Sequence, residues 1–494
     1  MPERCAPFAA FAALALSACG VADLPANDAS GSAIAGSDAV QALLKEAREA
    51  LQDGDLADAG QLLEEARGME PENAVVWSDI ARLRYRSGEH ALALEAVQFA
   101  LELAPRYAPA LLLRAQMVRD AHGLTAALPW FESAIDADPD NPEMLGEYAA
   151  TLGDAGYFTR MLEVTRELLE IEPRSPRALY LNAVLAARAG ETVLAKSLLE
   201  RSGLAAEGVS SAMLLDALID LSDRRYDSAA ETLAELSLRQ PGNRRVSELF
   251  ARSLWLGARD DELVERFAQQ ARRDDASPYL IMLVGRALER QGNRKSAAPY
   301  LERAYAGRVG GWVTLSPDAS LPEPTARMRE LVSAQNISAA RRYARRLQSR
   351  YPASADISAL SGDAALADGQ FAQALELYGK AAKVRRPWPL TRKAGAAYRS
   401  MGEDVAADVL IARHLAGEPR NTEALLLVAE WAARREDWLR VAVLVDNAIT
   451  LGAGNDPRLL KLRGIAARAL GKDEDARRFE RMTWELHPGI LPQG

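Results

Sequence analysis

Cysteine, histidine and aromatic residues are scarce in this chain of 494 residues. The only cysteines are Cys5 and Cys19, and aromatic residues make up 6 %. Because Cys5 lies within a segment that resembles a leader and the four histidines lie far apart, no group has the spacing of metal ligands. The apolar content of 49 % is dominated by alanine and leucine, both good helix formers. We therefore expect a mostly or wholly helical protein that needs no metal or cofactor.

Catalytic motifs are missing as well. The sequence contains no P-loop, no His-Glu-x-x-His, no Gly-x-Ser-x-Gly and no dinucleotide fingerprint placed after a strand. The net charge of -9 disfavours a dedicated nucleic-acid binder, because such proteins usually have a basic balance. We therefore expect a protein that is not an enzyme and does not bind nucleic acid.

Residues 1–18 have the order of a secretory signal peptide. One basic residue, Arg4, precedes an apolar stretch at about 6–16, which is followed by small residues. This stretch is too short to span a bilayer as a mature helix. The sequence "LSAC" that ends at Cys19 resembles the lipobox of bacterial lipoproteins, which implies cleavage before Cys19 and lipidation of its thiol and new amine. The alternatives are an ordinary cleaved signal peptide with an incidental cysteine and an apolar tail that is not cleaved.

The residues after Cys19 indicate where such a lipoprotein would go. Gly20, rather than an aspartate, resembles the outer-membrane sorting pattern of enterobacterial lipoproteins. It implies an outer-membrane lipoprotein that faces the periplasm, with retention in the inner membrane as the alternative. Residues 19–37 are rich in Ala, Gly, Ser and Asp without an apolar period, which predicts a flexible tether. The folded body is expected to begin near Asp38.

A period of 34 residues runs through most of the chain. The eighth position of each unit is small except at Met328, and a small residue there lets two helices cross closely. A second small position recurs on the second helix, with Met161, Leu263 and Val441 as exceptions. The units start at Val40, Ala74, Ala108, Pro142, Pro176, Ser210, Arg244 and Pro278, and then at about Leu321, Ala355, Trp388, Thr422 and Pro457.

Glycine and proline mark the boundaries within this period. Proline recurs where it would stop the second helix, and glycine recurs at the turn inside a unit, where a positive φ is useful. The turn glycines are Gly54, Gly88, Gly156, Gly190, Gly292, Gly369, Gly402 and Gly471. The stretch at 77–105 shows the pattern most fully, and it resembles the tetratricopeptide repeat (TPR) of two antiparallel helices.

The TPR resemblance covers about residues 40–490. It implies an all-α, right-handed α-solenoid of about thirteen helix-turn-helix units, with eight in residues 38–311 and five in 321–490. An insertion, "WVTLSPDAS", occupies residues 312–320. We interpret residues 306–325 as a joint between two segments, and a surface loop that merely lengthens one turn is the alternative.

The resemblance also implies that the first helices line an inner groove with positions two, five, nine, twelve and thirteen. These positions hold 17 cations and nine acids, a surplus of +8 in a chain whose total is -9. Such segregation favours an anionic partner, and arginine fits a carboxylate in two-point geometry. The alternative is that arginine simply replaces lysine in an arginine-rich composition, with many of these side chains paired to neighbouring acids.

Candidate groove residues are most frequent in units five to eight, where cations are mixed with aromatic or thioether surface as in binding hot spots. Core packing is the alternative for Tyr180 and Trp255. The run "RRYARRLQSR" at 341–350 falls on a second helix, where we expect a solvated face, with contact to anionic lipid heads or polysaccharide as the alternative. The candidates are Arg82, Arg86, Arg177, Tyr180, Arg188, Arg245, Arg252, Trp255, Tyr279, Met282, Arg286 and Arg290.

Together these features predict a lipid-anchored periplasmic scaffold that holds an extended or acidic segment of another envelope protein. TPR lipoproteins of similar layout serve pilus assembly, secretion systems and outer-membrane biogenesis, and the layout alone does not choose among these pathways. One alternative is a role in exopolysaccharide production and export, through export proteins or an acidic glycan. Another alternative is regulation of a peptidoglycan hydrolase.

Overall fold

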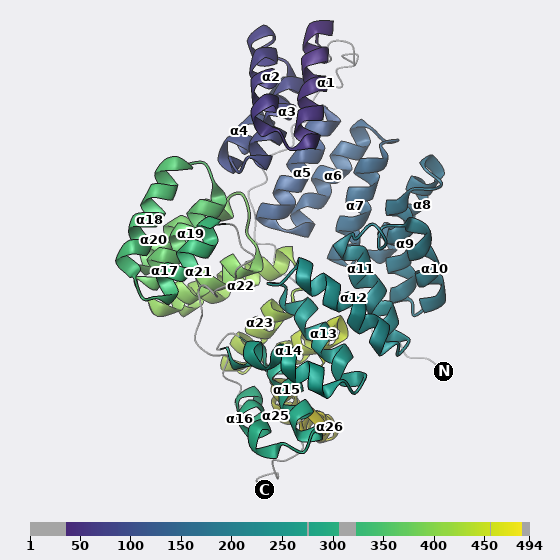
Figure 1. The fold of residues 1–494 in the computed structure, drawn as a ribbon, viewed down its shortest axis with the longest axis vertical. Coiled ribbons are helices and arrows are strands. Elements are labelled where there is room, and N and C mark those ends of the chain that lie inside the picture. Colours follow the sequence, from purple (N-terminus) through teal and green to yellow (C-terminus); the bar gives the residue numbers. More distant parts are fainter. Residues whose placement is uncertain (1–35, 274–275, 306–322, 455, 487–494) are drawn as a thin grey trace, which may run out of the picture.

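The computed structural model describes residues 36–273, 276–305, 323–454 and 456–486. Within these ranges it contains 26 α-helices and no strand, and a π-helical turn, η1 (Ile449–Ala453), extends α24. Consecutive helices pack in antiparallel pairs, as Figure 1 shows. The expected all-α solenoid of thirteen helix-turn-helix units is therefore confirmed.

Each unit consists of a first and a second helix. The first helices are α1 (Asp38–Asp53), α3 (Ala74–Arg86), α5 (Ala108–His122), α7 (Pro142–Ala155), α9 (Pro176–Arg188), α11 (Ser210–Ser222), α13 (Arg244–Leu256), α15 (Pro278–Arg290), α17 (Glu323–Ser333), α19 (Ala355–Ala367), α21 (Trp388–Ser400), α23 (Thr422–Arg434) and α25 (Pro457–Ala469). The second helices are α2 (Leu56–Met69), α4 (His90–Leu103), α6 (Leu124–Ala137), α8 (Phe158–Ile171), α10 (Thr192–Ser202), α12 (Tyr226–Arg239), α14 (Asp260–Arg272), α16 (Arg294–Tyr305), α18 (Ile337–Arg350), α20 (Phe371–Ala382), α22 (Asp404–Gly417), α24 (Trp438–Ala448) and α26 (Asp473–Leu486).

The helices begin where the period predicts. Eleven of the thirteen expected unit starts are the first residue of a helix, and α1 and α17 begin two residues from the expected place. The physical cause is visible at several starts, where an Asn or Asp side chain accepts hydrogen bonds from backbone amides of the first turn. Asn73, Asn141, Asn243, Asn421 and Asp456 all cap a first helix in this way.

The small positions of the repeat are fully buried between the two helices of a unit. Where the second helix carries a larger residue, the first helix can carry a smaller one. Met161 stands at the small position of α8, and a Cβ on Gly153 of α7 would lie 2.6 Å from its sulfur. A Cβ on Gly362 would likewise lie 2.5 Å from Cε1 of the buried Tyr378. Close helix crossing therefore explains the small residues and the exception at Met161.

The turn inside each unit places one residue in the left-handed region. All eight predicted turn glycines have positive φ, between 70° and 94°. In four other units the equivalent residue is not glycine, yet Arg224, Ala258, Gln335 and Glu436 also have φ of 56–62°. The turn geometry is thus kept even where an L side chain makes it costly.

The chain forms two segments that fold back on each other. We call units one to eight (α1–α16) the first segment and units nine to thirteen (α17–α26) the second segment. In Figure 1, α19–α22 of the second segment lie beside α4–α6 of the first. Hydrogen bonds join them, and Tyr85 and Leu94 pack against the apolar cluster of α19–α21.

The contacts between the segments follow the repeat. The loop after α18 contacts the start of α4, where the Ala91 amide donates to Ala353 O. The next loop contacts the end of α5, where the Arg386 amide donates to Asp120 O at 2.9 Å. The loop after α22 contacts the end of α7, where Arg420 donates to Gly153 O at 3.1 Å. Three successive loops of the second segment therefore meet three successive turns of the first. We call this surface the segment interface.

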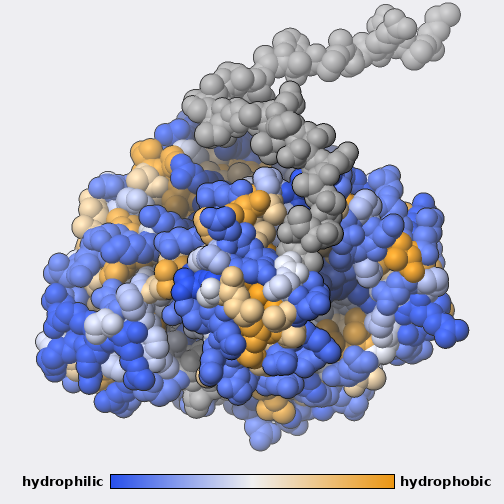
Figure 2. Space-filling view, turned by 90° about the horizontal axis from the view of Figure 1, so that it is seen from above, coloured by the Kyte–Doolittle hydropathy of each residue, from blue (hydrophilic) through white to orange (hydrophobic). Residues whose placement is uncertain are grey.

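Several expectations fall on residues outside the described ranges. These are the signal peptide at 1–18, Cys19, nearly all of the tether, the insertion at 312–320 and most of the joint at 306–325. None of the described helices combines the length and apolar character needed to span a membrane. Figure 2 shows one face of the molecule as mostly hydrophilic, with hydrophobic residues in separate small patches.

Candidate partner-binding surface

Ion pairs link consecutive first helices in the first segment. The buried Asp79 of α3 lies 2.7 Å from Arg48 of α1 and 3.9 Å from Arg82. Burial raises the pKa of Asp79, and the two arginines act against that rise. Glu147 of α7 accepts in the same way from Arg119 of α5 and from Arg177 of α9, at 3.0 and 3.2 Å. The candidates Arg82 and Arg177 are therefore already matched by an acid.

Arginine at position thirteen joins a first helix to the end of the preceding one. Arg86 donates to the carbonyl oxygen of Leu51, and Arg290 donates to that of Trp255 at 2.8 Å. Arg290 also forms an ion pair with Asp260. Carbonyls in the last turn of a helix lack partners within the helix, so these arginines satisfy them and complement the helix dipole.

The apolar candidates belong mainly to the core. Met282 is 4 % exposed and packs within the cluster of α13–α16, so the expectation that it offers thioether surface is wrong. Tyr180 and Trp255 are half-buried and pack against hydrophobic clusters, and the Arg290 guanidinium lies 5.2 Å from the Trp255 ring centroid. Core positions and expected groove positions of a first helix can both hold large apolar residues. The spacing of Met282, Tyr180 and Trp255 therefore did not show whether they pack in the core or face a partner.

Two more candidate arginines are engaged by neighbours. The Arg188 guanidinium lies 3.7 Å from the centroid of Phe158, and Arg420 of the second segment lies 5.4 Å from the same ring. Arg286 is mostly buried and forms an ion pair of 2.6 Å with Glu289. Arg188 therefore lies at the segment interface. Arg286 pairs with an acid of its own helix, α15.

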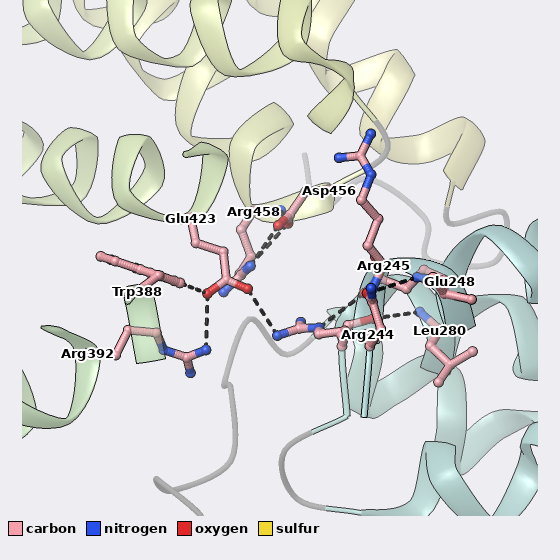
Figure 3. Close-up of polar contacts among 12 residues, drawn as sticks. Arg244, Arg245, Glu248, Leu280, Trp388, Arg392, Glu423, Asp456 and Arg458 are labelled. Atoms are coloured by element: carbon pink, nitrogen blue, oxygen red, sulfur yellow. Dashed lines mark hydrogen bonds and ion pairs between the residues drawn. The ribbon is translucent and has the colours of Figure 1, made fainter. Parts of the chain in front are cut away.

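One carboxylate collects donors from both segments. Glu423 of α23 accepts from Trp388 Nε1 at 2.8 Å, from Arg392 at 3.0 Å and from Arg244 at 3.1 Å (Figure 3). Burial tends to raise the pKa of Glu423, but Arg392, Arg244, the Trp388 hydrogen bond and Arg458 together outweigh it, so the pKa is lowered. Arg244 also pairs with Glu248, one turn along α13. This cluster fixes the start of α13 against α21 and α23.

Arg245 and Arg252 of α13 are the candidates that remain open. Within the described part of the chain neither forms an ion pair, and Figure 3 shows Arg245 extending away from Glu423. They are seven residues apart, so they share one face of the helix. Tyr279 of α15 lies near Arg252: burial raises the pKa of Tyr279 to about 12, and Arg252 acts against that rise. We call Arg245, Arg252 and Tyr279 the α13 patch.

The repeat architecture has a match among known families. A model of the tetratricopeptide repeat matches residues 44–93, 78–142 and 325–389. This chain is a TPR protein. Its fold is typically a non-catalytic scaffold for protein–protein interaction. No relative among the curated proteins matches it.

Solved TPR structures resemble parts of this TPR protein at low identity. PilF of Pseudomonas aeruginosa is 20 % identical over 43 % of this chain and 97 % of its own, with a TM-score of 0.37. PilW, a type IV pilus biogenesis factor, is 19 % identical over 42 % and 96 %, with a TM-score of 0.35. A TPR protein from Parabacteroides merdae ATCC 43184 is 17 % identical over 56 % and 95 %, with a TM-score of 0.28.

Part of the surface expected to line the groove is engaged in contacts within the protein itself. Glu423 and Arg392 stand at positions two and five of their units, which the sequence predicted as groove positions. The structure brings them together with Arg244, which stands at position one and was missed. No repeat signal marks Arg244, because its role depends on a helix 179 residues away in sequence. Among the described residues, no group of three or more His, Cys, Asp or Glu side chains is arranged to hold a metal ion.

Proposed function

We propose that this TPR protein is a lipid-anchored periplasmic scaffold that holds an acidic segment of another envelope protein at the α13 patch. The "LSAC" sequence ending at Cys19 supports the anchor, and the residue after it supports an outer-membrane location facing the periplasm. The TPR fold supports a protein partner. Stable anchoring by more than one acyl chain would keep the solenoid at the membrane while leaving the α13 patch open to the periplasm.

The observation that carries the binding site is the difference between the α13 patch and the other candidates. Arg82, Arg177, Arg286 and Arg290 each have an acid within the protein. Arg245 and Arg252 form no ion pair in the described part of the chain, although Glu248 lies between them and pairs with Arg244. Arginine forms paired hydrogen bonds with a carboxylate, so these two side chains suit an acidic peptide segment.

Charge reversal tests the patch directly. The double variant Arg245→Glu with Arg252→Glu should weaken partner binding at low salt by at least about tenfold, because both cations become repulsive. Arg166→Glu with Arg174→Glu makes the same charge change at two exposed arginines that form no ion pair with any described residue, and it should bind normally. Equal affinity of all three proteins would contradict the proposed site.

Photo-crosslinking in cells identifies the partner. A photo-reactive residue at position 245 should capture one envelope protein, identified by mass spectrometry, and the same residue at position 166 of α8 should not. The captured protein assigns the pathway among pilus assembly, secretion and outer-membrane biogenesis. Capture of polysaccharide-export components or glycan would replace this proposal with a role in exopolysaccharide export. Capture of a peptidoglycan hydrolase would instead favour its regulation.

The anchor is tested separately. Cys19→Ala should abolish incorporation of labelled fatty acid. Cys5→Ala removes the other cysteine, which lies within the proposed leader, and should leave lipidation unchanged. Fatty-acid labelling that persists in Cys19→Ala would overturn the lipoprotein proposal.

A further inference from the structure

Helix α18 differs in charge from the other second helices. It carries five arginines and no acid, whereas each of the other twelve described second helices contains at least one Asp or Glu. The net charge of the whole chain is -9, so this concentration runs against the average composition. The charge is therefore a local property of α18.

The arginines lie on the face of α18 that points away from the core. Ala340, Ala344 and Leu347 are its buried residues. By helical spacing, Arg342, Arg345 and Arg346 fall on the opposite side, where all three are exposed. Exposed Arg350 continues the row, so the charges extend over about 12 Å at 1.5 Å per residue. We call Arg342, Arg345, Arg346 and Arg350 the α18 face.

Neighbouring acids do not neutralise this row. Arg341, beside the face, pairs with Asp368 at 2.8 Å, but the four arginines of the face form no ion pair within the described residues. Glu323 of α17 contacts the Tyr343 hydroxyl instead. Like charges three and four residues apart on a helix destabilise it. The α18 face therefore carries an internal repulsion that an external anion would relieve.

Tyrosines hold two of these guanidiniums along the surface. Arg346 lies 5.7 Å from the ring centroid of Tyr343, and Arg350 lies 5.3 Å from that of Tyr351. Tyr351 is itself 44 % exposed. Tyrosine beside arginine is a combination suited to the headgroup region of a bilayer, where an amphipathic ring meets negative charge.

We propose that the α18 face binds the anionic headgroups of a phospholipid bilayer. A row of cations along one outer helix meets many headgroups at once, whereas a pocket for a single anion would need donors converging from several directions. Clusters of four or more cations on an amphipathic helix attract anionic lipid in this way. This contact goes beyond the proposed scaffold function and does not require lipidation. If the protein is also anchored at Cys19, the same contact would fix its orientation on the membrane, and that consequence rests on the proposed lipidation.

Vesicle binding by protein without a lipid anchor tests the proposal independently of Cys19. The full chain with Cys19→Ser should co-sediment with phosphatidylcholine vesicles that contain phosphatidylglycerol, and not with phosphatidylcholine alone. Adding Arg342→Gln, Arg345→Gln and Arg346→Gln should lower the affinity about 100-fold, since each cation near an anionic surface contributes several-fold. The matched control, Arg166→Gln with Arg174→Gln and Arg201→Gln, removes three exposed arginines outside α18 and should bind like the parent.

Three results would overturn the proposal. One is equal binding to both kinds of vesicle, and another is an equal loss of binding in the control variant. The third is complete displacement of the protein from vesicles by a soluble acidic polysaccharide at an equal concentration of negative charge, which would assign the α18 face to glycan. Circular dichroism of each variant confirms that the helices are intact, so a loss of binding reports on charge.

Discussion

The two segments are built from the same repeat but use their groove charges differently. In the first segment, Asp79 pairs with Arg48 and Glu147 pairs with Arg119 and Arg177, all from neighbouring first helices, so these ion pairs run along the solenoid. In the second segment, Glu423 takes Arg392 from its own segment and Arg244 from the first. Ion pairs therefore run along the length of both segments, since Lys393 also pairs with Asp363 in the second, and at Glu423 they also fasten the second segment to the first.

Packing at the eighth position also separates the segments. The first segment has alanine in seven of its eight units, whereas the second has glycine in three of five, at Gly362, Gly395 and Gly464. The absence of a side chain at Gly362 leaves room for the ring of Tyr378 on the facing helix. Met328, at the same position of unit nine, is fully buried although it is large. Close fits between particular pairs occur in both segments, since a Cβ at Gly285 of the first segment would lie 2.7 Å from Leu301, so the effect of a substitution depends on the individual pair.

The largest effect is expected from closing the space at the segment interface. A Cβ at Gly417 would lie 2.6 Å from the backbone oxygen of His122, and backbone cannot move aside as a flexible side chain does. Gly417→Ala should lower the free energy of unfolding by about 3 kcal/mol and separate the segments. Small-angle X-ray scattering should show a larger radius of gyration. Gly379→Ala in α20 should do neither, because a Cβ there would have no neighbouring atom within 4 Å.

The next largest effect is expected within one unit of the second segment. Gly362→Ala should cost about 2 kcal/mol, because its Cβ would overlap the ring of Tyr378, which donates to Asp363 at 2.8 Å. Gly395→Ala changes the same position in the next unit, where the nearest atom is Ile411 Cδ1 at 3.6 Å. It should be neutral or slightly stabilising in chemical denaturation. Similar losses in both variants would refute the account based on individual fits.

A smaller effect is expected from acid at the segment interface. His90 Nδ1 accepts from the Ala355 amide at 3.3 Å, and burial lowers the pKa of His90. A depressed histidine pKa means that the neutral ring stabilises the fold above the ordinary value near 6.5, and that this stability is lost as pH falls through the folded value. Between pH 7.5 and 5.5, opening at the Ala355 amide should increase.

Hydrogen exchange at the Ala355 amide, corrected for the intrinsic rate, measures this opening. The increase should reach up to about tenfold for each pH unit between the ordinary histidine pKa near 6.5 and the lower folded pKa, and it should level off below the folded pKa. His90→Asn keeps an acceptor that does not titrate, so its corrected exchange should be flat over this range. If the variant and the parent respond alike to pH, another group controls the opening.

The smallest effect concerns the turns of the first segment. Ala258 has a φ of 57°, in the region that costs an L residue free energy. Ala258→Gly should therefore raise the free energy of unfolding by about 0.5–1 kcal/mol, measured by urea denaturation. Gly292→Ala makes the opposite change at the equivalent turn of the next unit, where φ is 80°, and should destabilise by a similar amount. A loss of stability in Ala258→Gly would contradict this interpretation.

Sequence alone predicted the helices well because their determinants are local. Capping residues such as Asn73 and Asn243, turn glycines and buried small positions each act within one unit, so the period reveals them. The exceptions at Arg224 and Glu436 had no glycine to mark them, yet the period still placed their turns. Local patterns of this kind recur in every unit, and this recurrence allows them to be recognised in the sequence.

The surface was harder to predict because its state depends on distant residues. The charge count treated the groove as an open surface, but Glu423 and Arg244 come from different segments and occupy part of it. Met282 shares its spacing with groove residues and lies in the core. The alternative that many groove arginines pair with nearby acids holds for Arg82, Arg177 and Arg286. Arg245 and Arg252 were among the candidates, but no sequence signal set them apart.

The stepwise contacts between the segments give the number of repeats a geometric meaning. Arg420, in the loop before unit twelve, contacts unit four, and Glu423, three residues later, joins unit twelve to unit seven. Units four to seven thus form an arc of the solenoid, and both ends of this arc contact the same short stretch of chain at the start of unit twelve. An open solenoid can gain or lose a repeat at little cost. Here, removing one unit between four and seven would leave the arc too short to close, so duplication and deletion of repeats are constrained in this region.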